Sequence, residues 1–336
     1  MTRCVERRTG SYLLREAQVP GDSGAMLEVS NHYDSEKQTV EEFERLNASW
    51  RAPDPRLRLV VEDERGDIVG TSHCRRRESM TDGLFFLNAS VSPIATGRGI
   101  GSELLRVNEE FAWGLGCRRL TAFVAESDPR ARGFAERRSY VLGRHLFESV
   151  LCLSEVPSGK IDEALDRVSR FGVEITSLAD VGFDIATARK LFELSHECDK
   201  DEPATVEFGL QTYEDFDRTV FQATWFDPKS VLIAVVDGQW VGMHTFGLDP
   251  QNTIANVTVD FTGVLKEFRG RGIATALKLQ GVRLAAQFGG TKILTHNDSQ
   301  NAPMLAVNKK LGYVARPGWL MMDKHRPNDQ KEDKPK

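Results

Sequence analysis

The sequence predicts a mixed α/β protein in which one fold occurs twice in tandem. Three observations lead to this prediction: the chain has 336 residues, it repeats itself, and both repeats have the same order of strands and helices. Domains usually contain about 100–200 residues, so this length favours two of them. We expect each domain to be a mostly antiparallel, twisted sheet with a central βαβ crossover, flanked by helices.

The repeat is clearest around a glycine-rich segment. Residues 91–105 read VSPIATGRGIGSELL and residues 264–278 read VLKEFRGRGIATALK, 173 positions later. The same spacing separates Tyr140 from Tyr313, which end two similar segments. Further upstream, GDIVG at 66–70 and GQWVG at 238–242 are 172 positions apart, which we attribute to a one-residue change in a loop. Three matches in the same order indicate a duplicated domain.

The elements of the first repeat follow from alternating apolar residues and helical spacing. In chain order they are two hairpin arms at 57–62 and 68–76, a strand at 84–91, a helix at 99–113, a strand at 119–124 and a helix at 131–137.

The second repeat has the same order. Apolar, β-branched residues flank the turn Asp237-Gly238, which is typical of a hairpin. Apolar residues at helical spacing from Ala274 predict one helical face, and Gly289-Gly290 is a usual helix end. The expected elements are strands at 230–236, 240–247 and 256–264, a helix at 274–288, a strand at 292–295 and a helix at 302–310.

These elements set the expected domain boundaries. The first domain is predicted at 1–155 and the second at 172–326. The polar segment 154–160 contains proline and glycine and predicts a linker, followed by a helix at 161–171, so that 156–171 forms linker and helix. Residues 327–336 are polar and charged, and we expect a disordered tail there.

Composition excludes several classes of protein. Hydrophobic residues make up 40% and charged residues 28%, as in ordinary soluble domains. A net charge of −5 argues against nucleic acid as the partner. The 5 cysteines are scattered and form no CxxC pair, which argues against disulfides and a metal site. With no apolar signal core or spanning segment, we expect a cytoplasmic protein without a membrane partner.

Each glycine-rich segment follows a strand and precedes a helix. A helix begins with unpaired N–H groups and the positive end of its dipole. Glycines leave room above these groups, so the turn is an anion cradle suited to a pyrophosphate. Thr275 and Ser102 stand where a dinucleotide fingerprint needs glycine, and no Gly-Lys-Ser/Thr follows. The residues of the two cradles are Arg269, Gly270, Arg271, Gly272, Ile273 and Ala274, and Gly97, Arg98, Gly99, Ile100 and Gly101.

With these segments the chain resembles the GNAT superfamily of acyl-CoA-dependent N-acyltransferases. Arg269, Gly272 and Ala274 match the family motif Arg/Gln-x-x-Gly-x-Gly/Ala, and residues 301–313 resemble its closing helix and strand. The resemblance covers about the whole chain as two GNAT units. It implies that acetyl-CoA or another acyl-CoA is the donor, with its pyrophosphate on residues 269–274.

The resemblance also implies a position for the pantetheine arm. It would pair with the strand edge near Val264 and Leu265, where this strand diverges from the next one. Asn297 and Asn301 are then further candidates for cofactor contacts. In the first repeat the corresponding strand end is Val91-Ser92. Thr96 stands where the family has Arg or Gln, so we expect CoA binding there with an altered phosphate contact.

Amine acylation needs a base for the amine and a proton for the leaving thiolate. Asp260, four residues before Val264, is a candidate base that acts through a water molecule. The alternative is a solvated or hairpin-paired carboxylate. His296 is a second candidate beside the cleft, although a lone histidine is often structural. His244 on the hairpin is a weaker candidate.

Family members often have a catalytic tyrosine five residues before the closing aromatic residue. Counting back gives Asn308 in the second repeat and Ala135 in the first. Asn308 can hydrogen-bond the CoA sulfur or pantetheine but is no acid. The first repeat has Leu87 where we align Asp260. We therefore expect catalysis in the second domain and a degenerate, CoA-binding first domain.

The leading functional hypothesis is an enzyme that transfers an acyl group to a primary amine. Tandem GNAT proteins that resemble this chain include enzymes of small-molecule and antibiotic metabolism in actinomycetes, which favours a natural-product amine as the acceptor. The alternative is a non-catalytic acyl-CoA sensor or scaffold, supported by the missing tyrosines.

Overall fold

A computed structural model describes residues 6–33, 37–48, 54–76, 83–203, 205, 209–248 and 256–326. Internal contacts divide the chain into two compact units. The first unit contains residues 1–144 together with 319–336, and the second contains residues 145–318. The boundaries 1–155, 156–171 and 172–326 were derived from the duplicated sequence, and they stay a prediction about the repeat. The tail at 327–336 lies outside the described residues.

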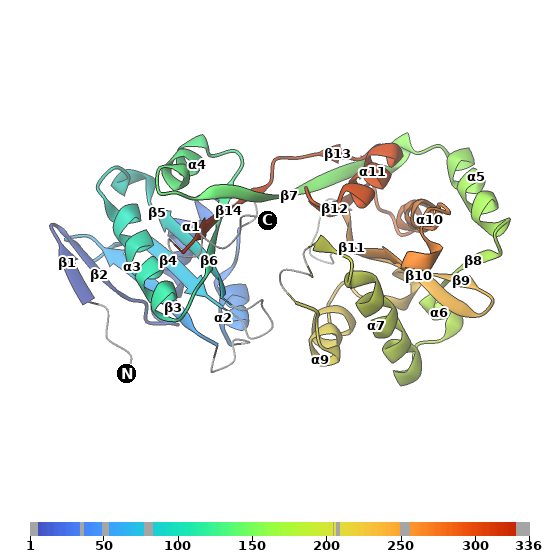
Figure 1. The fold of residues 1–336 in the computed structure, drawn as a ribbon, viewed down its shortest axis with the longest axis horizontal. Helices are drawn as coiled ribbons and strands as arrows, with labels where there is room; N and C mark the ends of the chain where they lie inside the picture. Colours follow the sequence, from blue (N-terminus) through green and yellow to red (C-terminus); the bar gives the residue numbers. More distant parts are fainter. Residues whose placement is uncertain are drawn as a thin grey trace, which may run out of the picture. The chain divides into compact units, whose positions relative to one another are not determined.

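The first unit is a sheet covered by helices (Figure 1). Its strand order is β1-β2-β3-β4-β5-β6-β14, and all neighbours are antiparallel except the parallel pair β5–β6. The last strand of the chain, β14, therefore completes the sheet of the first unit. The strands are β1 Glu6–Thr9, β2 Tyr12–Glu16, β3 Arg56–Glu62, β4 Ile68–Arg75, β5 Leu84–Val91, β6 Arg119–Ala125 and β14 Trp319–His325. The helices are α1 Ser23–Asn31, α2 Val40–Ala48, η1 Pro93–Ala95, α3 Ile100–Gly114 and α4 Pro129–Glu136.

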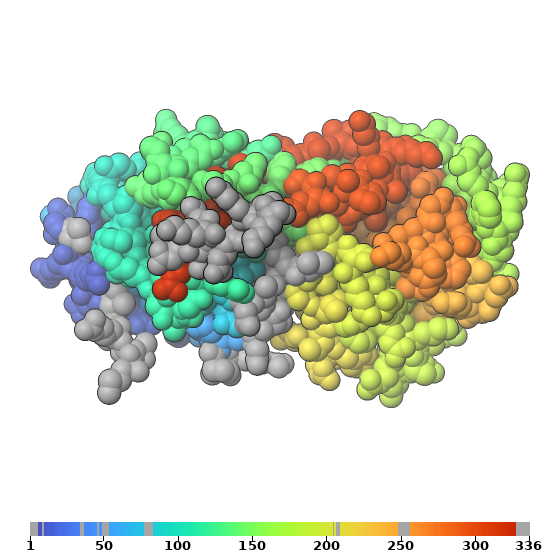
Figure 2. All heavy atoms as spheres, viewed as in Figure 1, coloured from blue at the N-terminus to red at the C-terminus, as the bar shows by residue number. Residues whose placement is uncertain are grey.

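The second unit repeats this plan. Its strand order is β7-β12-β11-β10-β9-β8, β13 also pairs with β7, and β11–β12 is the parallel pair. The strands are β7 Val141–Cys152, of which residues 145–152 belong to this unit, β8 Val173–Ser177, β9 Val231–Val236, β10 Gln239–Leu248, β11 Asn256–Val264, β12 Lys292–Asp298 and β13 Val314–Ala315. The helices are α5 Ser158–Ser169, α6 Leu178–Val181, α7 Ile185–Asp199, α9 Tyr213–Phe216, α10 Ile273–Gln287 and α11 Ala302–Leu311. Short helical turns are η2 Leu153–Glu155, η3 Asp217–Phe221, η4 Pro228–Ser230 and η5 Lys266–Phe268. Figure 2 shows the surfaces of α5 in green, α10 in orange and α11 in red on this unit.

The mixed α/β fold with a parallel crossover in each unit is confirmed, and most expected elements lie within two residues of their observed bounds. Two differences concern the linker and the strand after the crossover helix. The segment 154–160 is not an open linker, because α5 already begins at Ser158. β12 continues to Asp298 instead of ending at 295, because β7 pairs with it along its whole length.

The spacing between matching residues of the two repeats changes from 172 to 173 because of one extra residue. This residue lies in β11 and not in a loop. In the pairing of β10 with β11, Thr245 opposes Phe261 and Phe246 opposes Val259, so Asp260 has no partner and forms a β-bulge. The first unit has no such shift, because Cys74 opposes Leu87 and His73 opposes Asn88 in the pairing of β4 with β5. Our alignment of Asp260 with Leu87 was therefore wrong: Leu87 corresponds to Val259, and Asp260 is an inserted residue.

The two cores use complementary residues at one contact between helix and sheet. In the second unit Gly281 makes room for the buried ring of His244, since a Cβ there would lie 2.5 Å from His244 Nε2. The counterparts in the first unit are Asn108 and Ser72, and Asn108 Nδ2 donates to Ser72 Oγ at 2.7 Å. A large ring facing glycine and a small hydroxyl facing an amide fill similar space.

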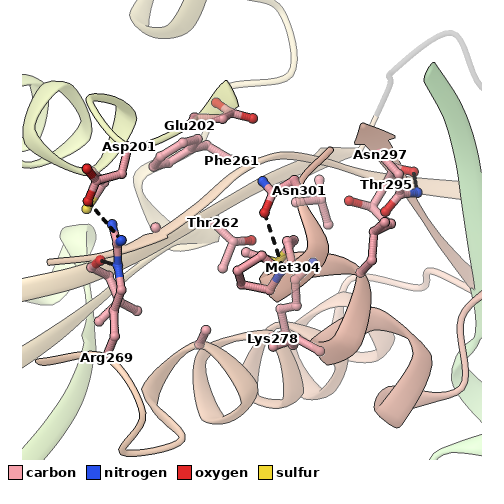
Figure 3. Close-up of a pocket in the computed structure, with 18 of the residues that line it drawn as sticks. Asp201, Glu202, Phe261, Thr262, Arg269, Lys278, Thr295, Asn297, Asn301 and Met304 are labelled. Atoms are coloured by element: carbon pink, nitrogen blue, oxygen red, sulfur yellow. Dashed lines mark hydrogen bonds and ion pairs between the residues drawn. The ribbon is translucent and has the colours of Figure 1, made fainter. Parts of the chain in front are cut away.

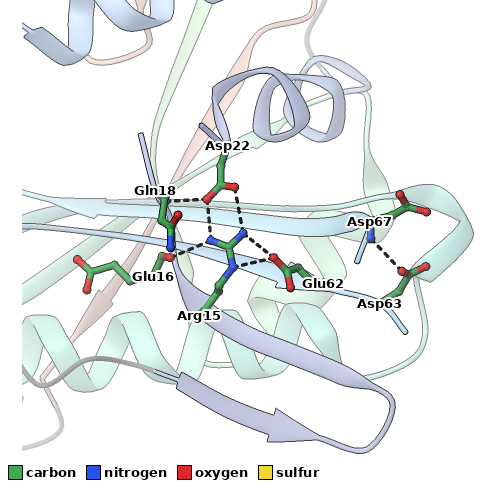
Figure 4. Close-up of polar contacts among 7 residues, drawn as sticks. All are labelled: Arg15, Glu16, Gln18, Asp22, Glu62, Asp63 and Asp67. Atoms are coloured by element: carbon green, nitrogen blue, oxygen red, sulfur yellow. Dashed lines mark hydrogen bonds and ion pairs between the residues drawn. The ribbon is translucent and has the colours of Figure 1, made fainter. Parts of the chain in front are cut away.

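An ion-pair cluster fixes the start of α1 on the first sheet (Figure 4). Arg15 on β2 donates from Nη1 to Asp22 Oδ2 at 2.7 Å and from Nε to Glu62 Oε1 at 2.7 Å. Its guanidinium lowers the pKa of Asp22. Met26 and Leu27, in the helix that follows Asp22, line a cavity of this unit, so the cluster positions one wall of that cavity.

Three further observations concern the cysteines, metal binding and membrane spans. Of the cysteines that the structure describes, Cys74, Cys117, Cys152 and Cys198 are free thiols. Among all the residues that the structure describes, no group of His, Cys, Asp and Glu side chains is arranged to hold a metal ion. None of the described helices is both long and apolar enough to cross a membrane.

Candidate active site

The second unit contains a cavity of about 590 Å³ at the point where its parallel strands separate (Figure 3). The pairing of β11 with β12 ends at Val259 and Thr295, and both strands continue beyond it. The cavity is lined by these strands, by the turn before α10, by α11 and by the chain after α7. An extended ligand can therefore reach strand-edge N–H and C=O groups that have no partner strand.

Asp260 lies at this opening. Its carboxylate lines the cavity, and Thr245 Oγ1 donates to Asp260 Oδ2 at 3.2 Å. Asp260 as a whole is exposed to solvent, while protein atoms surround its carboxylate. Desolvation raises the pKa of Asp260, and the hydrogen bond from Thr245 and the charge of His296 act in the opposite direction. A carboxylate with a raised pKa is a stronger base.

The glycine turn before α10 is open. Gly270 and Gly272 have φ of 78° and 85°, in the left-handed region that glycine adopts most readily. A Cβ on Gly270 would meet no atom within 4 Å, and Gly272 precedes the helix without a side-chain cap. Together with Ile273 and Ala274 both glycines line the cavity. The first N–H groups of α10 thus have space for an anion, as the sequence predicts, although pyrophosphate binding itself stays a prediction.

Arg269 connects this turn to its surroundings (Figure 3). Its Nε donates to the carbonyl oxygen of Val264 at 2.9 Å, and its Nη1 donates to Asp201 Oδ2 at 2.9 Å. Val264 and Arg269 both line the cavity. The guanidinium therefore holds the strand end and the turn together, and a phosphate contact would have to share it with Asp201.

Arg271 of the predicted cradle and Leu265, a predicted contact of the pantetheine arm, do not line the cavity. Arg271 donates to the carbonyl oxygen of Glu267 at 3.3 Å, and its guanidinium lies over the Phe268 ring. Leu265 is buried in the core and does not line the cavity. Their predicted contacts with the cofactor stay predictions.

His296 lies within β12 rather than at its end. Its side chain is 72% exposed, and Nδ1 lies 4.0 Å from Glu148 Oε1. It lines the cavity near Asp260.

Two asparagines form a buried hydrogen-bonded pair. Asn308 Nδ2 donates to Asn297 Oδ1 at 2.7 Å, and Asn297 Nδ2 donates to Ser149 Oγ at 3.0 Å. Asn297 lines the cavity, whereas Asn308 does not. In this geometry Asn308 orients Asn297, and its predicted contact with the CoA sulfur stays a prediction.

Asn301 caps α11. Its Oδ1 accepts from the backbone N–H of Met304 at 3.3 Å, as Figure 3 shows. Asn301 also lines the cavity, so the predicted cofactor contact would be added to a capping role.

The sequence interpretation missed Lys278 on α10. This side chain is 1% exposed and lines the cavity, and its Nζ lies 5.2 Å from the centre of the Tyr313 ring. No carboxylate pairs with it among the described residues, and burial lowers its pKa to about 7. The available signal was a lysine four residues after Ala274, on the apolar face of the predicted helix.

A second missed group lies at the end of α7. Asp199 is half-buried, and desolvation together with the charge of Glu202 raises its pKa to about 7. Asp201 and Glu202 follow it and line the cavity. The cavity therefore has an acidic side formed by these residues and Asp260.

The first unit has its own cavity, of about 980 Å³. Gly97 and Gly99 have φ of 77° and 83°, and a Cβ on either would meet no atom within 4 Å. Five of the seven residues predicted to contact the cofactor in this unit line the cavity: Val91, Gly97, Gly99, Ile100 and Gly101. The other two do not line it: Ser92 precedes η1, and Arg98 donates from Nη1 to the Tyr12 hydroxyl at 2.8 Å.

A model of the acetyltransferase (GNAT) family matches the chain twice, over residues 25–140 and 190–313. The chain belongs to the GNAT family. Both GNAT matches fall on the repeats found in the sequence, so the tandem organisation is confirmed. As a GNAT protein it is an acyl-CoA-dependent N-acyltransferase, with acetyl-CoA or another acyl-CoA as donor.

Several curated relatives carry the same name. The chain is 29% identical over 285 residues to mycothiol acetyltransferase of Streptomyces coelicolor, which covers 84% of each chain. It is 28% identical over 276 residues to the protein of the same name from Acidothermus cellulolyticus, covering 76% of each. It is 26% identical over 225 residues to that of Clavibacter sepedonicus, covering 66% of this chain and 67% of the relative.

Solved GNAT structures share the fold. A tandem GNAT protein from the clavulanic acid biosynthesis pathway matches with a TM-score of 0.65 and 17% identity, over 94% of this chain and 98% of that one. A GCN5-related N-acetyltransferase from Sphaerobacter thermophilus matches with a TM-score of 0.67 and 18% identity, over 95% and 97%.

Proposed function

We propose that the second unit transfers an acetyl or other acyl group from acyl-CoA to the primary amine of a small molecule. The observation that carries this proposal is the bulge carboxylate of Asp260 in the cavity next to the open glycine turn. The first unit has a similar turn but neither the bulge nor a carboxylate at this place. The name of the curated relatives supports a small-molecule acceptor and makes a mycothiol-related amine one candidate.

The donor binds along the diverging strands. Its pyrophosphate lies on the backbone of residues 269–274, and its pantetheine arm pairs with β11 beyond Val259. Arg269 keeps this strand end and the turn in register through Val264. Asn297, oriented by Asn308, provides an amide on the opposite wall.

The acceptor approaches from the acidic side of the cavity. Glu202 and Asp260 attract an ammonium group, and Asp260 removes one of its protons directly or through one water molecule. The amine nitrogen then attacks the thioester carbonyl. A C–N bond forms, the attacking nitrogen gives its second proton to water in the cavity, the C–S bond breaks, and the CoA sulfur leaves as a thiolate.

Lys278 supplies the proton to this thiolate. The position that often carries tyrosine in this family is Asn308, which has no acidic proton. The ammonium form of a lysine with a pKa of about 7 donates a proton readily near neutral pH. The same ammonium group is attracted to the developing negative charge on sulfur.

The first unit binds acyl-CoA without turnover. Its turn has the same left-handed glycines as the second, which supports binding. Its counterpart of Lys278 is Leu105, a core residue, and it lacks the inserted carboxylate.

Release of the CoA thiol tests this assignment. The purified chain is incubated with acetyl-CoA and a panel of amines that includes amino sugars and mycothiol-related amines. Gly272→Glu is expected to abolish thiol release by filling the second turn, and Gly99→Glu is expected to retain it. Loss of turnover only in Gly99→Glu would assign catalysis to the first unit. Acetyl-CoA binding without thiol release for any amine would favour the sensor function.

A further inference from the structure

The first cavity has a cationic end that the second cavity lacks. Arg58, His73 and Asn88 lie in one row across β3, β4 and β5, since Arg58 opposes His73 and His73 opposes Asn88. All three residues line the cavity. Neighbouring strands are about 4.8 Å apart, so the Arg58 backbone lies about 10 Å across the sheet from Asn88.

Asn88 marks the point where the strands of the first unit diverge. The pairing of β5 with β6 ends at Leu87 and Ala122, one residue before Asn88. The same cavity continues from here along Val91 to the glycine turn at 97–101. One ligand can therefore extend from the turn past Asn88 to Arg58.

The charge of Arg58 is not balanced by the residues around it. Its Nη1 donates to Asn47 Oδ1, and its guanidinium lies 4.8 Å from the centre of the Phe43 ring. In the part of the chain that the structure describes, no carboxylate pairs with it. Burial and the charges of Arg56 and Arg75 lower the pKa of Arg58 to about 10, so it remains charged at neutral pH. A half-buried cation without a counter-ion is costly, and a bound anion would remove this cost.

His73 does not supply the missing negative charge. Burial and the neighbouring arginines lower its pKa to about 2, so the ring is neutral. A neutral imidazole next to the guanidinium can donate to or accept from a ligand oxygen, depending on its tautomer.

The second unit has an uncharged row at the equivalent positions. Thr245 opposes Val231 on β9 and Phe261 on β11, so these three residues correspond to His73, Arg58 and Asn88. The acidic groups of that cavity come from other positions. The first unit therefore has a cation in this row where the second unit has none, which loss of catalytic residues alone does not explain.

We propose that the first cavity binds a carboxylate at Arg58. The carboxylate is either the free end of a dicarboxylic acyl group on CoA or a separate carboxylic acid that lies beyond the cofactor. The first of these rests on the proposed binding of CoA to the first unit. Guanidinium groups bind carboxylates through two parallel hydrogen bonds, and a site that excludes bulk water strengthens such a pair.

Calorimetric titration of full-length Gly272→Glu tests the proposal, because this substitution confines CoA binding to the first unit. The ligands are acetyl-CoA, succinyl-CoA, and succinate alone or with CoA. We expect succinyl-CoA to bind at least 10-fold more tightly than acetyl-CoA, or succinate to bind by itself. Adding Arg58→Gln is expected to remove the preference for succinyl-CoA, or the binding of succinate, while the affinity for acetyl-CoA stays within 3-fold of that of Gly272→Glu alone.

Two variants control for charge and folding. Arg65→Gln removes an exposed arginine from the turn of the same hairpin and is expected to change neither titration. Arg58→Lys keeps the charge and is expected to retain part of the preference. Equal affinities for succinyl-CoA and acetyl-CoA, with no binding of succinate, would overturn the proposal. Should no CoA thioester bind to Gly272→Glu, the proposed cofactor site of the first unit fails, and the succinate titration alone decides the role of Arg58.

Discussion

Lys278 occupies the helical position that Leu105 occupies in the first unit, and both side chains are buried. A lysine at this depth loses hydration, which explains why its pKa lies near 7. A purely structural role would be filled better by leucine or methionine. The presence of a buried lysine at position 278 therefore supports a proton-transfer function.

Replacing Lys278 by methionine is expected to stabilise the protein while lowering turnover. The folded pKa of about 7 lies below the ordinary lysine pKa of 10.5, so the folded state binds fewer protons than the unfolded state between these pH values. Stability of the native protein then rises with pH over this window, and the penalty is fully present below pH 7. Its size is on the order of a few kcal/mol. Urea unfolding at pH 6 and pH 10 measures it.

Leu105→Met is the matched control for this substitution. It is expected to destabilise slightly at both pH values and to leave turnover unchanged. A Lys278→Met variant that retains full turnover would exclude Lys278 as the proton source, whatever its stability.

Asp260→Asn is expected to lower kcat by about 10²–10⁴-fold, because the amide cannot take the proton of the amine. The pKa of Asp260 is raised, so turnover of the native protein should increase with pH as the carboxyl group ionises. This increase of kcat with pH, the acidic limb of the pH profile, is expected to disappear in the variant, while KM for acetyl-CoA changes little. The pH dependence of kcat for the native protein and the variant is the measurement.

Glu267→Gln serves as the control, because Glu267 is exposed and does not line the cavity. It should preserve the acidic limb. An Asp260→Asn variant with an unchanged pH profile would mean that another group, such as Asp199 or His296, is the base.

At the scale of secondary structure, the glycine turns were predictable and the bulge was not. The sequence of each turn requires left-handed backbone, and Gly99 and Gly272 adopt it. The spacing between matching residues of the two repeats, 173 in one place and 172 in another, showed that one residue had been inserted. A loop was the simpler place to expect it. Only strand pairing shows that the inserted residue is Asp260, because a bulge and a loop insertion have the same length signature.

Deleting Asp260 is expected to convert β11 into a regular strand like β5. The strands would then diverge differently, and the affinity of the second unit for CoA is expected to fall at least about 10-fold, since strand-edge contacts depend on this geometry. Asp260→Gly keeps the bulge, removes only the carboxylate and should bind CoA normally. Calorimetry in a Gly99→Glu background compares the two. Equal affinities would mean that the bulge has no part in donor binding.

At the scale of the whole molecule, the repeat predicted two similar domains but not which segments build each unit. The repeat assigns each segment to a domain by its position along the chain, so residues 319–325 would belong to the second domain. In the structure, however, β14 pairs with β6 of the first unit. No local pattern in residues 319–325 shows which of the two sheets this strand joins. Asp201 and Glu202 on the acceptor side and the row at Arg58 were also not predicted, since they come from separate strands and loops.

Removing residues 319–336 is expected to destabilise the first unit. Leu320, Met321 and Met322 on β14 are buried, and each such side chain contributes about 1.5–3 kcal/mol. Thr121 Oγ1 also loses its hydrogen bond to Asp323 Oδ1, at 2.6 Å. Calorimetric unfolding should show an early transition for the truncated chain. Removing only residues 327–336 is the control, and an unchanged transition in the longer truncation would contradict the assignment of β14 to this unit.

A crystal structure of the chain with acetyl-CoA tests the central claim most directly. We predict that the pyrophosphate lies on the backbone of residues 269–274 and that the thioester lies within one water molecule of the Asp260 carboxylate. A second cavity that stays empty at saturating acetyl-CoA, or a thioester directed away from Asp260, would contradict it.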